Sequence, residues 1–202
     1  LIFTPIILKE IKMNGIQFSV IKPRLGFMFN SYGSDLVKAF SGNTDKLIIG
    51  PLFGLSLLGN YHLAMQFLVI ATIIPGIITQ YTLPRDSSGE NNDKIKKYVI
   101  IFSTLIAIIG IIFGPTIIDL LFPEYNGTIE IIQIMILAII PRTISLTLIS
   151  KFLGMEKSKF VIIGFTIFLL VQIPTIVIFG EIAGIIGIVL AHIIADFIAA
   201  ML

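Results

Sequence analysis

The sequence has no cysteine and no tryptophan, and it carries little charge. Of its 202 residues only two are histidine and 13% are charged. Without cysteine there is no disulfide, no cysteine nucleophile and no thiolate metal site. The sequence also lacks a dinucleotide-binding glycine motif, a P-loop and an HExxH zinc motif. We therefore expect no enzyme activity, no cofactor and no metal site, and we expect no nucleic-acid partner.

Hydrophobic residues dominate instead, at 56% of the chain, and the mean hydropathy is +1.02. This composition is typical of membrane proteins with several spans. Runs such as VIIFSTLIAIIGIIFG lack the alternation of a barrel strand. We predict an all-α fold, a polytopic transmembrane helix bundle of about six spans. The predicted spans cover residues 25–53, 60–83, 98–122, 129–150, 161–179 and 185–202.

Residues 1–24 are predicted to hold the end of a preceding span and a loop, and residues 25–202 to form one transmembrane lobe. Because the chain opens on LIFTPIILKE and stops inside an apolar run, we expect it to be a fragment of a larger transporter.

Lysine and arginine alternate between the predicted loops. They gather around residues 9–24, 85–97 and 151–159 and are absent near 54–59, 123–128 and 180–184. The positive-inside rule predicts that the basic loops face the cytoplasm.

The first complete span is the most polar one. Its polar residues recur every three or four positions, at Asn30, Ser31, Ser34, Asp35, Lys38, Ser41, Gly42 and Asp45. This spacing places them on one stripe of a helix, which should face a bundle interior or an aqueous cavity rather than lipid. We interpret Asp35, Lys38 and Asp45 as substrate-cavity residues. The alternative for Asp35 and Lys38 is an internal ion pair that neutralises itself.

Three other ionisable residues inside the predicted spans are candidate functional residues. Arg142 follows Pro141, and if the substrate carries a phosphate or diphosphate, its guanidinium is suited to bind that group in the cavity. The alternative is a structural bond to the carbonyls that Pro141 leaves free. His192 and Asp196 are four residues apart on one helix face, a geometry that predicts a proton relay.

Short motifs follow one another from about residue 25 to the end. The first group is DKLIIG at 45–50, FG at 53–54 and LGNYHLA at 58–64, with Pro75 and Pro84-Arg85 after it. The second group is FPxY at 122–125, LGxxKxK at 153–159 and IAGIIG at 182–187. Together they resemble the C-terminal half of polysaccharide flippases of the MOP (multidrug/oligosaccharidyl-lipid/polysaccharide) exporter superfamily.

The resemblance implies two six-helix lobes around a central cavity. It also implies a multi-pass protein of the cytoplasmic membrane, through which polyprenyl-phosphate-linked or diphosphate-linked oligosaccharide crosses by alternating access. Expected partners are this substrate, membrane lipids and a missing N-terminal lobe, with glycan-assembly proteins as further candidates. His192 and Asp196 stand where the family usually has small apolar residues. Two rivals remain: an ion-coupled multidrug exporter of the same superfamily, and a non-transporting membrane scaffold whose polar stripe is buried against a partner helix.

Overall fold

The computed structural model describes residues 22–123 and 128–201, in which nearly every residue is helical. The elements are η1 (Lys22–Arg24), α3 (Leu25–Phe53), α4 (Leu55–Ala71), α5 (Ile73–Ser87), α6 (Asp93–Leu121), α7 (Ile129–Met135), η3 (Ile136–Ala138), α8 (Ile139–Gly154) and α9 (Ser158–Ala200). The described ranges contain no strand, so the all-α prediction is confirmed. The predicted end of a preceding span and most of the loop at 9–24 lie outside the described residues.

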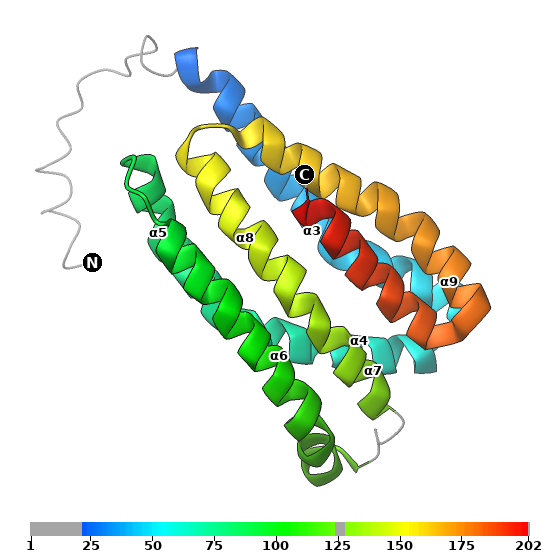
Figure 1. The fold of residues 1–202 in the computed structure, drawn as a ribbon. Coiled ribbons are helices and arrows are strands. Elements are labelled where there is room, and N and C mark those ends of the chain that lie inside the picture. Colours follow the sequence, from blue (N-terminus) through cyan, green and yellow to red (C-terminus); the bar gives the residue numbers. More distant parts are fainter. Residues whose placement is uncertain (1–21, 124–127, 202) are drawn as a thin grey trace, which may run out of the picture.

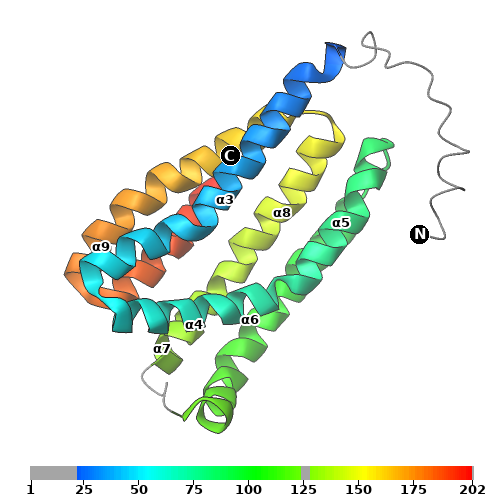
Figure 2. The same cartoon turned by 180° about the vertical axis from the view of Figure 1, so that it is seen from behind.

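The chain changes direction sharply at three places. Gly54, between α3 and α4, has φ +92°, a value that glycine adopts without strain. α4 then crosses the bundle, and α5 departs from it at 45° (Figure 2). Within α9, Gly184 has φ +59°, and the chain folds back so that α9 forms two arms (Figure 1). A side chain at Gly187 would overlap the Phe179 carbonyl of the first arm, so these arms pack at backbone distance.

The helix bounds follow the predicted spans with local differences. α3 coincides with 25–53, and the two arms of α9 correspond to 161–179 and 185–202. The prediction at 60–83 crosses the bend between α4 and α5. Among the described residues, α6, the α7–α8 stretch and α9 are long and apolar enough to cross a membrane, and the bent pair makes a fourth candidate. The division into six spans stays a prediction.

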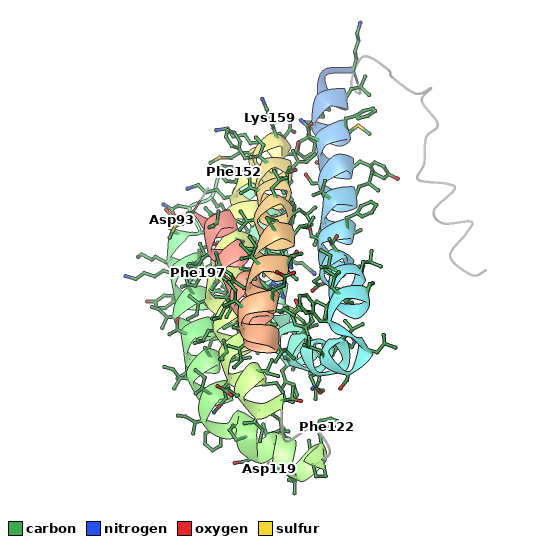
Figure 3. The ribbon with its side chains drawn as sticks, turned by 90° about the vertical axis from the view of Figure 1, so that its right-hand side faces the viewer. Asp93, Asp119, Phe122, Phe152, Lys159 and Phe197 are labelled. Carbon is green, nitrogen blue, oxygen red and sulfur yellow. The ribbon has the colours of Figure 1, made fainter. Side chains whose placement is uncertain are left out.

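The described basic segments gather at one end of the bundle. Figure 3 shows Lys159 and Phe152 at this end and Asp119 and Phe122 at the opposite end. The turn from α5 to α6 lies toward the same end as the turn from α8 to α9 (Figure 1). The exposed pair Arg24–Glu156, 3.4 Å apart, joins the start of α3 to this end.

The core lies where α3, α4, α7, α8 and α9 meet. Fully buried side chains there include Ile49, Leu68, Met135, Ile139, Ile176 and Ile188. Large apolar side chains also cover the outside, among them Phe29 at 82% exposed and Leu120 at 78%. Such an outer surface is suited to contact lipid tails rather than water.

Candidate functional site

A pocket of about 450 Å³ opens between α3, α5, α8 and α9, and we call it the four-helix pocket. Its lining residues are Phe27, Ser31, Ser34, Asp35, Lys38, Leu83, Pro84, Ser87, Ile149, Leu153, Gly154, Val161 and Phe165. This volume lies within the usual range for small-molecule sites. Since Pro84, Ser87 and Gly154 adjoin the basic loops, the pocket lies in the half of the bundle that carries those loops.

Asp35 and Lys38 give the pocket its charge. Both side chains are exposed, and within the described ranges they form no ion pair with each other. Ser34 donates to the Asn30 carbonyl at 2.8 Å, whereas the buried Ser31 Oγ has no partner among the described residues. The two charged groups are therefore available to a polar ligand, whereas the Ser31 hydroxyl is covered in this conformation.

Asp45 and Arg142, also predicted to line a cavity, lie elsewhere. They belong to a second group of side chains, the buried polar cluster, which we define as Asp45, Tyr61, Arg142, Gln172, His192 and Asp196. The structure thus divides the four predicted cavity residues between the four-helix pocket and this cluster. The lining of one cavity by all four stays a prediction.

One side of the buried polar cluster is a short hydrogen-bond network. Tyr61 Oη donates to Asp45 Oδ2 at 2.7 Å and lies 3.2 Å from His192 Nδ1. Gln172 Nε2 lies 2.9 Å from the same Nδ1. Asp45 also accepts from the Lys46 backbone N–H at 2.8 Å. All four residues of the network are at most 1% exposed, so burial and hydrogen bonding fix their geometry.

The other side of the cluster holds its cation. Arg142 NH2 lies 3.5 Å from His192 Nε2, and Arg142 Nε lies 3.8 Å from Asp196 Oδ2. His192 Nε2 is 3.5 Å from the same carboxylate oxygen. The Arg142 side chain is 26% exposed and therefore forms the edge of the cluster. Its contacts reach α9, and no hydrogen bond to a carbonyl near Pro141 occurs in the described ranges.

Sequence reasoning placed His192 and Asp196 on one face but missed two members of the cluster. Tyr61 belongs to the LGNYHLA motif, but nothing in this motif predicts its hydrogen bond to Asp45 or its contact with His192. Gln172 is the lone amide in the apolar run FVIIGFTIFLLVQIPTIVIFG, a signal that could have found it. The proton relay itself stays a prediction.

A third polar group fixes the end of the bundle near the basic loops. Asp86 accepts from Lys96 Nζ at 2.8 Å, from Ser150 Oγ at 2.6 Å and from Asn92 Nδ2 at 3.0 Å, so it ties α5 to α6 and α8. Asp86 lies beyond the span predicted to end at residue 83. Burial alone raises the pKa of Asp86, but the hydrogen bonds from these donors and the Lys96 charge outweigh it and hold this pKa below its usual value.

Comparison with known proteins gives the family. The family model described as "Polysaccharide biosynthesis protein" matches residues 3–126. The chain belongs to this family. Taken with its apolar helices, this membership makes it a multi-pass membrane protein of polysaccharide biosynthesis.

A curated relative supports the assignment. The chain is 25% identical over 210 residues to the lipopolysaccharide biosynthesis protein WzxC of Escherichia coli (strain K12). The aligned region covers 96% of this chain but only 42% of that relative, so the chain spans less than half the relative's length. No solved structure matches the chain significantly.

Proposed function

We propose that this chain is the C-terminal lobe of a flippase for polyprenyl-phosphate-linked or diphosphate-linked oligosaccharide. The proposed activity is transport across the cytoplasmic membrane by alternating access, for polysaccharide biosynthesis and export. Membership of the polysaccharide biosynthesis family and the likeness to WzxC support it. The observation that carries the proposal is the four-helix pocket, which presents Asp35 and Lys38 inside a bundle of apolar helices.

The physical argument concerns the cost of those charges. A charged side chain in the hydrocarbon region costs at least about 2.5–3.5 kcal/mol unless it has partners or water. Within the described ranges Asp35 and Lys38 do not neutralise each other in an ion pair, so another interaction must offset this cost. A hydrated pocket that receives sugar hydroxyls supplies such an interaction, because carboxylate, ammonium and hydroxyl groups all hydrogen-bond to sugars.

We propose that the basic loops face the cytoplasm. The four-helix pocket then lies toward the cytoplasmic side, where the lipid-linked oligosaccharide arrives. The prenyl tail remains in lipid beside the exposed apolar faces of the bundle. Membrane lipids and the remainder of the protein, including an N-terminal lobe, are the other proposed partners.

Arg142 is the proposed contact for the substrate phosphate. Its guanidinium is partly exposed at the edge of the buried polar cluster, and arginine binds phosphate in a bidentate geometry. Asp45, at 1% exposed, does not reach a ligand in this conformation. We propose that Asp45 acts through the cluster instead of by direct contact.

The test uses the full-length protein in proteoliposomes with a fluorescent lipid-linked oligosaccharide. We expect translocation in the wild type and its loss in Asp35→Ala and Arg142→Ala. The matched control is Asp119→Asn, an exposed carboxylate at the other end of the bundle. Absence of translocation together with ion-coupled efflux of cationic dyes would favour the multidrug exporter. Absence of both would favour the scaffold.

A further inference from the structure

The buried polar cluster contains a row of groups that can exchange protons, the relay path, whose last step is longer than a hydrogen bond. It runs from Asp45 Oδ2 to the Tyr61 hydroxyl at 2.7 Å, then to His192 Nδ1 at 3.2 Å. From His192 Nε2 it continues to Asp196 Oδ2 at 3.5 Å. We propose that this relay path binds one proton inside the lobe and transfers it between the carboxylates of Asp45 and Asp196. The inference rests on the proposed function only for its role in driving transport.

The formal charge of the cluster supports the binding of a proton. The charged groups that face one another are Asp45 on α3, Asp196 on α9 and Arg142 on α8, so two carboxylates meet one guanidinium. Lys46 does not join them, because its ammonium lies 3.5 Å from Asn43 Oδ1 on its own helix. With His192 neutral, the cluster carries one uncompensated negative charge. Such a charge is costly in an apolar bundle, and one bound proton removes it.

The oxygens of the cluster point to the place for that proton. Asp196 Oδ2 is buried and accepts no hydrogen bond in the described part of the chain. Its ion-pair partners, Arg142 Nε at 3.8 Å and His192 Nε2 at 3.5 Å, are both distant for a hydrogen bond. A proton on this carboxyl group removes the charge of an acceptor that the fold leaves unsatisfied.

The Gln172 amide, as it is oriented in this structure, selects one tautomer of the imidazole. An amide nitrogen only donates, so at 2.9 Å from Gln172 Nε2 the His192 Nδ1 must accept. The ring proton of neutral His192 is then on Nε2, on the side of Asp196. Gln172 Oε1 has no partner among the described residues. Rotation of the amide by half a turn would let Oε1 accept from a protonated Nδ1, so the site can satisfy either tautomer.

The relay step balances atom by atom. A proton that arrives on Asp45 Oδ2 passes to the Tyr61 oxygen as the Tyr61 hydroxyl gives its own proton to His192 Nδ1. His192 in turn gives its Nε2 proton to Asp196 Oδ2. Tyr61 and His192 each gain one proton and lose one, and His192 ends as the other neutral tautomer. The net result is one proton moved from Asp45 to Asp196, with no change in electrons.

The first arm of the test measures the bound proton directly and needs no transport. Infrared pH titration of the purified full-length protein should show the carbonyl band of a protonated buried carboxyl. The charge count predicts that either Asp45→Asn or Asp196→Asn abolishes the band, because each variant makes the cluster neutral without a proton. Asp119→Asn should leave the band unchanged. A band that persists in both cluster variants, or that is absent from the folded wild type, overturns the proposal.

The second arm measures oligosaccharide translocation under an imposed pH difference. A difference of one pH unit is a tenfold ratio of proton concentrations across the membrane. The wild-type translocation rate should therefore change by up to about tenfold for each pH unit imposed. Tyr61→Phe keeps the aromatic ring and the formal charge of the cluster but removes the hydroxyl from the relay path. This variant should therefore keep the infrared band and lose the dependence of the translocation rate on the pH difference. A response to a sodium gradient in place of the pH difference overturns the proposal.

The two arms separate this inference from the proposed function. If the band behaves as predicted but no oligosaccharide crosses under any gradient, the proton site stands and the flippase assignment fails. If translocation occurs but the band is absent and the rate ignores pH, the flippase stands and the proton site fails.

Discussion

Replacement of Asp86 by alanine should loosen the end of the bundle that carries the basic loops. The Asp86 side chain is 6% exposed and its partner Lys96 is 11% exposed, with 2.8 Å between the charged atoms. Removing one member of a buried pair costs about 3–5 kcal/mol, because the other charge is left unpaired. The lost bonds from Ser150 and Asn92 belong to the same cost. We expect about 3 kcal/mol, since the Lys96 ammonium near the bundle end can recover some water.

The assay is equilibrium unfolding of the full-length protein in mixed micelles, titrated with a denaturing detergent. A double-mutant cycle with Lys96→Met isolates the pair, and we expect a coupling energy of at least about 1 kcal/mol. The matched control is Glu90→Ala, which removes the exposed Arg85–Glu90 pair, 2.7 Å apart between the last turn of α5 and the loop after it, and should not change stability measurably. An Asp86→Ala cost below about 1 kcal/mol, with no coupling to Lys96, would refute the reasoning.

The pH dependence of this pair has a definite sign. The folded-state pKa of Asp86 is lowered from its ordinary 3.8, so its contribution is fully present above pH 3.8. It is lost as the pH falls through the folded-state pKa. The stability difference between the wild type and Asp86→Asn should therefore stay constant from pH 8 to about 5 and shrink only below 3.8. A difference that already shrinks between pH 7 and 5 would contradict this assignment.

The remaining predictions concern backbone packing and orientation. Gly187→Ala should abolish folding, because a Cβ there overlaps the Phe179 carbonyl, while Gly164→Ala has open space and should fold normally, as judged by size-exclusion profiles. Cysteines that replace Gly89 and Ile182 should be labelled by membrane-impermeant thiol reagents from the cytoplasmic and the outer side respectively, and the reverse pattern would overturn the proposed orientation.

The helices could be predicted because apolar runs and polar loops are local features. α3 begins and ends where its polar stripe predicts, and the fold-back of α9 falls at Gly184, inside the short loop predicted at 180–184. The bend between α4 and α5 has a local cause as well. Pro75 has no N–H for the Ala71 carbonyl and its ring crowds that turn, so the helix breaks at Thr72. The position of Pro75 in the sequence is therefore sufficient to predict a bend in this span.

The polar sites could be predicted only in part because partners come from distant helices. The stripe on α3 correctly marks a polar face, but it cannot tell that Asp35 opens to a pocket while Asp45 meets Tyr61, sixteen positions away. His192 and Asp196 share a face by spacing alone, yet their contact with Arg142 joins helices fifty positions apart. Periodicity carries no information on such pairings.

The measurement that most directly tests the central claim is substrate protection of the four-helix pocket. Ser87→Cys places a thiol in the pocket lining of the full-length protein, and Ser88→Cys places one at the adjacent exposed position outside the lining, with Asp35 and Lys38 intact in both. We predict that a membrane-impermeant reagent labels both positions and that lipid-linked oligosaccharide slows the labelling at position 87 but not at position 88. If position 87 is not labelled, or is labelled at the same rate with and without the oligosaccharide, the substrate does not pass through this pocket.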